Sequence, residues 1–192
     1  MRNAGTLLLA GGAFASVILV AFGLAMIIAG AMGINEVRDL LAEENIVAPE
    51  DSSIPGQLVD TGSEARAMAD IMREHALALT GGATYSELPR YLDANGEPTN
   101  DAAAAEIGEN GQPIANPART LWVTETALST SLNFAAFAEL VGLFAIVAGV
   151  ALLLTGIGFA VLTLGMFRSP SLKSGPAAAP VPPAASGPAP VA

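Results

Sequence analysis

Cysteine is absent from this chain, and histidine occurs once, at position 75. Without cysteine there are no disulfides, so any domain outside the cytoplasm must be held together by packing alone. One histidine and no thiolate also exclude a zinc site of the usual nitrogen or sulfur kind and an iron site made of two histidines and a carboxylate. The sequence therefore predicts no cofactor and no metal.

Charge is missing from two long stretches, Asn3 to Asn35 and Leu140 to Phe167, which contain no Asp, Glu, Lys or Arg. A bilayer core about 30 Å thick needs roughly 20 apolar helical residues, and both stretches are longer. We expect an all-α membrane protein with two transmembrane helices, residues 6–33 and 139–167. A small, mainly helical extracytoplasmic domain, residues 34–138, would extend them.

Basic residues are scarce, and their positions predict the orientation. The segment between the spans carries 5 Arg against 17 Asp and Glu (5 − 17 = −12), whereas the two ends carry Arg2, Arg168 and Lys173 and no acid. Lys and Arg close to a span favour the cytoplasmic side. We therefore expect a cell-membrane protein whose termini, residues 1–5 and a disordered Pro/Ala-rich tail at 168–192, are both cytoplasmic. The acidic segment argues against a nucleic-acid partner.

A cleaved signal peptide is the alternative for the first apolar stretch. Ala29-Gly30-Ala31 has the small-x-small form of a cleavage site, and Arg2 could supply the basic region before it. Signal peptides have apolar regions of only about 7–15 residues, and this run is about twice as long. The sequence therefore favours a retained helix.

Helical spacing and capping residues predict the elements between the spans. The first helix should continue to about Glu44, and the capping box Thr61-Gly62-Ser63-Glu64 should open a second helix that ends at Gly81-Gly82. Along that second helix, five residues at helical spacing predict a buried stripe: Met68, Ile71, Met72, His75 and Leu79.

Two further segments lead back to the membrane. Thr84-Tyr85-Ser86-Glu87 repeats the capping pattern and predicts a short helix. Two Asn-Gly turns, at Asn95 and Asn110, indicate a loop excursion over residues 93–117. From about Pro117, one long helix should carry the chain into the second span, with Trp122 packed in the outer domain.

Few residues are suited to chemistry. His75 could act as a base or ligand near Tyr85 or Glu87, but a helix residue with a local hydrogen bond is the simpler interpretation. The oxygen-rich loop from Asp93 to Asp101 fails the spacing of an EF-hand and is interpreted as a solvated turn. Glu139 lies about 43 Å along a straight helix from Arg168, so we expect an interfacial carboxylate rather than an ion-handling one.

The spans contain small residues at close spacing, which lets helix backbones approach each other. The candidate packing positions are Ala21, Ala25, Ala29 and Gly33 in the first span and Gly142, Gly149 and Gly156 in the second. They predict that the spans pack on each other, on a second copy of the chain or on a larger membrane protein.

Two segments also carry a resemblance. Residues 43–47 (Glu-Glu-Asn-Ile-Val) and 80–87 (Thr-Gly-Gly-Ala-Thr-Tyr-Ser-Glu), with the helix ending at His75 between them, resemble a group of actinobacterial two-span membrane proteins without an established activity. The resemblance covers the spans and roughly residues 36–92, and the Asn-Gly turns look like an insertion. Similar sequences sometimes carry an aromatic-ring-opening dioxygenase label. This chain does not support that label, because it cannot supply the two histidines of a non-haem iron site.

Three classes of function follow from these patterns. We expect a non-enzymatic structural or accessory component of a cell-envelope membrane complex, whose partners are the lipid bilayer and another membrane protein or a second copy. The alternatives are a homo-oligomeric two-span channel and an extracytoplasmic enzyme or sensor. Neither span carries an ionisable residue at depth, which disfavours a transporter.

Overall fold

The computed structural model describes residues 2–168, with side chains for residues 7–165. This part of the chain folds into three helices and a small sheet. The helices are α1 (Arg2–Glu43), α2 (Gly62–Leu79) and α3 (Pro117–Arg168). The strands β1 (Tyr91–Leu92) and β2 (Pro98–Thr99) pair antiparallel. The Pro/Ala-rich tail lies outside the described residues.

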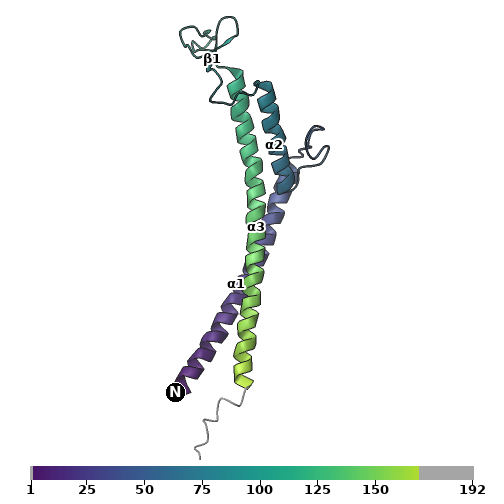
Figure 1. Cartoon of the computed structure of the whole chain (residues 1–192), viewed down its shortest axis with the longest axis vertical. Helices are drawn as coiled ribbons and strands as arrows, with labels where there is room; N and C mark the ends of the chain where they lie inside the picture. The colour runs from purple at the N-terminus through teal and green to yellow at the C-terminus, as the bar shows by residue number, and fades with distance from the viewer. Residues whose placement is uncertain (1, 169–192) are drawn as a thin grey trace, which may run out of the picture.

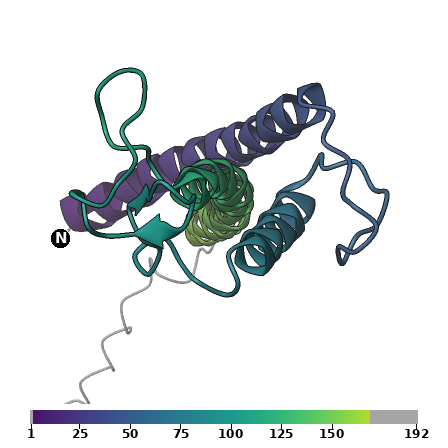
Figure 2. The same cartoon turned by 90° about the horizontal axis from the view of Figure 1, so that it is seen from above.

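The central element of the molecule is α3, against which both other helices pack (Figure 1). Its 52 residues span about 78 Å at 1.5 Å per residue, without interruption. One half of α3 contacts α1 and the other half contacts α2, while α1 and α2 barely touch. In Figure 2, α1 and α2 flank α3 on different sides. The single long helix predicted from about Pro117 is confirmed.

The two apolar helices approach each other through glycines. A Cβ built on Gly23 would lie 2.6 Å from the carbonyl oxygen of Gly149, and one built on Gly30 would lie 2.5 Å from that of Gly142. Only a residue without a side chain fits at these positions. Ser16 continues the series, since its hydroxyl donates to the carbonyl of Gly156 over 2.8 Å.

Large aliphatic side chains fill the spaces that the α3 glycines leave open. A Cβ on Gly142 would lie 2.7 Å from Ile34 Cγ1, and one on Gly149 would lie 2.9 Å from Ile27 Cγ1. The contact therefore has a seven-residue repeat on both helices: Ser16, Gly23 and Gly30 opposite Gly156, Gly149 and Gly142. This repeat keeps one seam of each helix facing its partner over a long distance.

Of the seven predicted packing positions, three lie in this contact. Gly142, Gly149 and Gly156 are buried against α1, as just described. Ala21, Ala25, Ala29 and Gly33 lie on exposed surface of α1 instead. The contact between the spans therefore does not use these four positions, because the two helices meet at a spacing of seven. Packing of this face on a second copy or on a larger membrane protein stays a prediction.

The outer half of α3 packs against α2, again through small residues. The buried residues of α2 are Gly62, Ala65, Ala69, Ile71 and Ala76. A Cβ on Gly62 would lie 2.9 Å from Ala136 Cα. The predicted stripe is partly wrong: Ile71 is buried and Met68 and Met72 are half-buried, but His75 and Leu79 are exposed.

A small apolar core forms where all three helices meet. It contains Leu41 from the end of α1, Val59 from the loop between α1 and α2, and Leu132 from α3, with Ala48, Ala65 and Ala69 between them. Val59 is fully buried. The loop is folded back on itself, because Val59 N donates to Ile46 O over 2.8 Å. This core fixes the end of α1 to the start of α2.

The predicted caps and turns are present, with one exception. Thr61 and Glu64 form the capping box of α2, and Gly81 and Gly82 adopt positive φ of 64° and 86° after it. Around Thr84 the same pattern closes a turn, not the helix we predicted, since the chain runs directly into Pro89.

The loop excursion at the outer end carries the two β-strands of the described residues. Both of its Asn-Gly turns have a glycine at positive φ, 80° at Gly96 and 72° at Gly111. The first turn joins β1 to β2, and isolated bridges link the rest of the loop to β1 and its neighbours.

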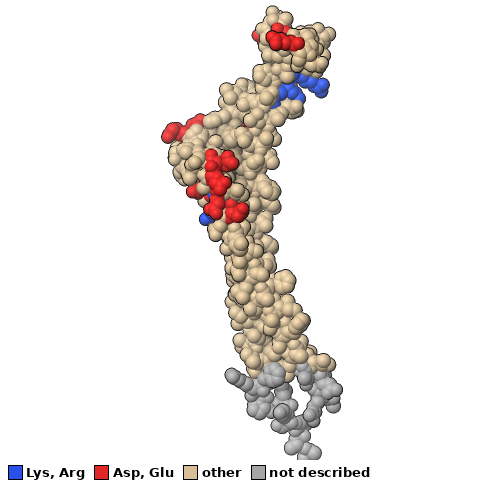
Figure 3. Space-filling view, turned by 180° about the vertical axis from the view of Figure 1, so that it is seen from behind, with Lys and Arg blue, Asp and Glu red and all other residues tan. Residues whose placement is uncertain are grey.

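By length and composition, α1 and α3 can each cross a membrane. Only 11% and 17% of their most apolar windows are buried, so their side chains mostly face outward, unlike those of a soluble core helix. Figure 3 shows the acidic side chains gathered on the outer half of the molecule, and no charged side chain in this view on the described part of the inner half.

Candidate functional site at the three-helix junction

The residues with catalytic potential do not form one site. His75 Nε2 lies 2.7 Å from Asp51 Oδ2, so it ties α2 to the loop before it, and both side chains are about half exposed or more. His75 thus makes a hydrogen bond, as expected, but its partner Asp51 lies 24 residues away and was not indicated by the sequence. The hydrogen bond to His75 holds the pKa of the Asp51 carboxyl below its usual range. The contact is a tether between two surface segments.

Tyr85 and Glu87 have partners of their own. The Arg119 guanidinium lies 3.9 Å from the centre of the Tyr85 ring and donates to Leu88 O over 2.8 Å. Glu87 accepts hydrogen bonds from the hydroxyl and the amide of Thr84, both at 2.7 Å, which lower the pKa of its carboxyl. Both residues therefore shape the turn that follows α2.

The oxygen-rich loop also satisfies its own backbone. Asp93 accepts from the amides of Asn95 and Glu97 at 2.8 and 2.9 Å, and these bonds, that of Glu97 first, lower the pKa of its carboxyl. Among the described residues, no group of three or more His, Asp and Glu side chains could hold a metal ion.

Glu139 is the polar residue that joins the three helices. One carboxylate oxygen accepts from Arg38 Nε of α1 over 2.5 Å, and the other accepts from the amide of Gly62, the first residue of α2, over 2.7 Å. The carboxylate itself belongs to α3. Its side chain is 16% exposed, so this contact is largely shielded from water. An acidic group at a helix N-terminus also complements the helix dipole.

The capping box of α2 lies directly beside this junction. Glu64 accepts from the amide and the hydroxyl of Thr61, at 2.9 and 2.8 Å, and from the amide of Asp60 at 3.1 Å. Burial raises the pKa of the Asp60 carboxyl, and the neighbouring Glu64 adds to that effect. The cap of α2 and the ion pair with Arg38 therefore use two different carboxylates, Glu64 and Glu139.

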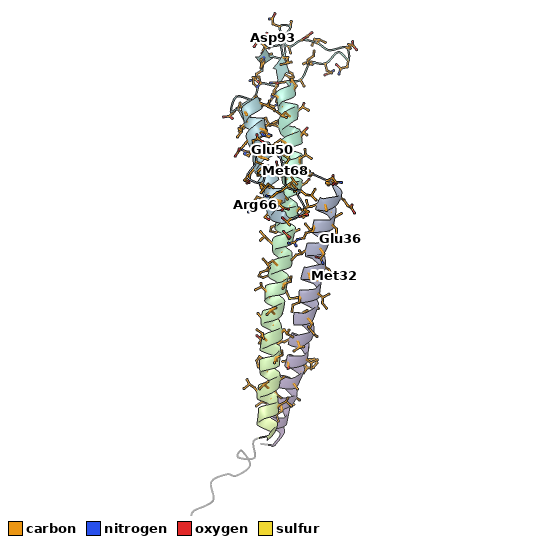
Figure 4. The ribbon with its side chains drawn as sticks, turned by 90° about the vertical axis from the view of Figure 1, so that its right-hand side faces the viewer. Met32, Glu36, Glu50, Arg66, Met68 and Asp93 are labelled. Atoms are coloured by element: carbon orange, nitrogen blue, oxygen red, sulfur yellow. The ribbon has the colours of Figure 1, made fainter. Side chains whose placement is uncertain are left out.

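A groove opens next to Glu139, with a volume of about 390 Å³. Its apolar lining is Ile34, Ala136, Leu140 and Leu143, and its polar lining is Arg38, Gly62, Ser63, Arg66 and Glu139. Figure 4 shows Arg66 at the inner end of α2, close to where α3 continues past it. The groove thus lies at the boundary between the acidic and the charge-free halves of the molecule.

A second, more polar hollow of about 510 Å³ lies near the outer end, lined by Tyr85, Ser86, Leu88, Arg90, Asn100 and Arg119. On the neighbouring turn of α3, Trp122 is buried, and its indole N–H donates to Ala83 O over 3.0 Å. Arg73 of α2 covers the Trp122 ring at 5.3 Å. Packing of Trp122 in the outer domain, as predicted, is confirmed.

Several residues of these sites were missed by inspection of the sequence. Arg38 was counted only as a charge, although it is the first basic residue after the first apolar stretch, as Glu139 is the last acid before the second. Gly23 and Gly30 were overlooked within an alanine-rich span. A search for a seven-residue repeat shared by both spans would have found them.

Comparison with known proteins provides no relative. Neither protein-family models, nor curated proteins, nor solved structures match the chain. The resemblance to actinobacterial two-span proteins therefore stays a prediction.

Proposed function

We propose that this chain is a non-enzymatic integral membrane protein that acts as a structural or accessory component of a cell-envelope complex. In this proposal α1 and α3 cross the bilayer, both termini are cytoplasmic, and the outer half stands in the extracytoplasmic space. The observation that carries it is α3, a single 52-residue helix that runs from the apolar half into the outer domain. Such a helix makes one continuous connection between the two halves of the molecule.

The contacts along α3 support a structural role for this helix, because they hold it to both other helices. The inner half is held to α1 by backbone contacts at Gly23 and Gly30, and the outer half is held to α2 through Gly62 and Ala69. Glu139 locks the two contacts together. The close fit of α1 on α3 also supports a retained first helix.

The chemistry of the side chains supports a role without catalysis. His75, Tyr85 and Glu87 each serve a local contact, to Asp51, Arg119 and Thr84 respectively. Nucleophilic catalysis needs a nucleophile and a base within hydrogen-bond reach of each other at one cavity, and these three residues are engaged with separate partners instead.

An exposed apolar face on the outer half of α3 supports contact with another membrane protein. Phe134 and Phe137 are 67% and 58% exposed, although they lie beyond Glu139 on the side away from the charge-free stretch. Their rings are 6.4 Å apart and form one patch. Large exposed apolar side chains at the inner end of an acidic domain favour contact with a protein partner over exposure to water.

The test is purification of the native protein in mild detergent, with its companions identified by mass spectrometry and its mass measured. We expect a stoichiometric larger membrane protein. The double variant Phe134→Ser/Phe137→Ser should lose it, whereas the control Ile107→Ser should retain it, because Ile107 is equally exposed at 57% but lies on the outer loop. A homo-oligomer without companions would overturn the accessory role and favour a channel.

A further inference from the structure

We propose that the groove beside Glu139 binds one anionic glycerophospholipid of the outer leaflet, with its phosphate near Arg66 and an acyl chain along Leu140 and Leu143. The inference rests on the membrane placement proposed above. It assigns this chain a specific lipid contact, separate from the partner face at Phe134.

The level of the groove along α3 matches the level of lipid headgroups. From Glu139 to Arg168 the helix rises about 43 Å, and a bilayer with its headgroup layers is about 40–45 Å thick. With Arg168 at the cytoplasmic headgroups, Glu139 therefore lies at the outer ones. The groove extends from there toward the charge-free half through Leu143.

The lining of the groove has an apolar part and a polar part, which follow each other in the order of the acyl chain and the headgroup of a phospholipid. Ile34, Leu140 and Leu143 belong to or border the charge-free stretches. Above them lie the hydroxyl of Ser63 and the guanidinium of Arg66, both on the first turns of α2. An acyl chain fits the first group, and a phosphate fits the second.

The charges of the lining favour an anionic lipid. Arg38 and Arg66 outweigh the single carboxylate of Glu139, which leaves one positive charge. Arg38 already donates to Glu139. Among the described residues Arg66 has no partner for its guanidinium, so its donors are available to a phosphate. The amide of Gly62 donates to Glu139, so it is not available to a phosphate.

The experiment uses the full chain, purified alone in detergent, with binding measured by native mass spectrometry and by the shift in melting temperature. The probes are phosphatidylglycerol, phosphatidylcholine and inorganic phosphate. We expect phosphatidylglycerol to bind with a stoichiometry of one and to raise the melting temperature more than phosphatidylcholine, and inorganic phosphate to have no effect.

Two variants of α2 make the test specific. Arg66→Gln should weaken the binding of phosphatidylglycerol about tenfold and remove its preference over phosphatidylcholine, and Arg66→Lys should keep the preference. Arg73→Gln is the matched control, because it removes the same charge from the same helix two turns further out, next to Trp122. It should bind the lipid as the unmodified chain does.

Three results would overturn the proposal: equal binding of the two lipids, an unchanged preference in Arg66→Gln, or stabilisation by inorganic phosphate alone, which would indicate a free-anion site. The outcome is distinguishable from that of the proposed function. If the chain binds the lipid but purifies without a companion, the lipid site stands and the accessory role is overturned. If it purifies with a companion but does not bind the lipid, only the lipid site is overturned.

Discussion

The inner and outer halves of α3 pack against their partners with the same spacing but for different physical reasons. In the inner half, Gly23 and Gly30 let the backbones of α1 and α3 touch, and one hydroxyl, that of Ser16, crosses the contact. In the outer half, small residues of α2 let α3 bring Leu132 into a core with Val59.

This difference agrees with the proposed placement of the inner half in lipid and of the outer half in water. Between apolar surroundings and an apolar helix there is no hydrophobic gain from association, so close backbone packing must supply the attraction. In water, burial of side chains such as Val59 and Trp122 contributes, and small residues serve mainly to let them reach each other. One long helix can use both contacts because the small buried residues that face it repeat every seven residues in each, at Gly23 and Gly30 of α1 and at Gly62, Ala69 and Ala76 of α2.

The largest effect should come from filling a glycine of the inner contact. A side chain at Gly149 would overlap the carbonyl oxygen of Gly23, where a Cβ has only 2.7 Å. We expect Gly149→Val to destabilise the contact by about 3 kcal/mol or more. Gly158→Val is the matched control on the same helix, because a Cβ there meets nothing within 4 Å.

The absence of cysteine provides a direct readout for this prediction. A Cβ on Gly12 would lie 4.0 Å from Thr163 Cβ, within the range of a disulfide. In a Gly12→Cys/Thr163→Cys background, α1 and α3 should cross-link readily. Addition of Gly149→Val should lower the yield severalfold, while Gly158→Val leaves it unchanged. Equal yields in both variants would contradict the close approach of Gly149 to the backbone of α1.

The next largest effect should come from the junction between the halves. Glu139→Ala removes the partner of Arg38 and the acceptor of the Gly62 amide, so we expect a loss of about 1–2 kcal/mol. Arg38→Gln removes only the ion pair and should cost less, since the Arg38 side chain is 50% exposed. Hydrogen exchange at the Gly62 amide should rise in Glu139→Ala and stay low in Arg38→Gln.

A smaller effect on stability should distinguish the two segments of the outer half that share the same capping pattern. Thr61 caps the 18-residue helix α2, whereas Thr84 closes only a turn. We expect Thr61→Ala to lower the free energy of unfolding of the outer half by about 1 kcal/mol and Thr84→Ala by less. Denaturant unfolding followed by the emission of Trp122, the one tryptophan, measures both. A larger loss in Thr84→Ala would reverse this ranking.

The smallest effect should be a response to acid that is confined to the outer half. The carboxyls of Asp51, Glu87 and Asp93 have lowered pKa values because they accept hydrogen bonds in the folded chain. A lowered folded-state pKa gives stability that is present above the usual carboxyl range, near pH 4, and is lost as the pH falls through the folded value.

Hydrogen exchange between pH 7 and pH 3 checks this response. The amides of Thr84 and Glu97, which these carboxylates hold, should lose protection below about pH 4. The cross-link between positions 12 and 163 should form equally at each pH when a pH-independent reagent is used, because residues 140–165 contain no acid. Acid loss of that cross-link would show that the inner contact depends on the outer one.

Local signals in the sequence predicted much of the fold. The capping box at Thr61, the paired glycines at 81 and 82 and the proline at 117 mark helix ends because each fits a specific backbone geometry. The pattern at Thr84 failed as a helix signal although its hydrogen bonds formed, because a cap fixes only a first turn and Pro89 prevents more.

The candidate site was less predictable. Glu139 was expected at an interface, but nothing near it in sequence names Arg38, 101 residues away, as its partner. His75 follows the spacing of the methionines on α2, yet it is exposed, because α2 meets α3 through alanines instead. Periodicity gives the faces of a helix, and it does not say which face its neighbour takes.

What the sequence by itself determined is the division of the chain: two charge-free stretches, an acidic segment between them, and the ends of its helices. These depend on composition and on contacts over a few residues. Only the tertiary structure decided that Gly23 and Gly30 form the seam rather than Ala25 and Ala29. That choice depends on how the surfaces of two helices fit together. An alanine-rich helix has several faces lined by small residues, and composition does not distinguish them.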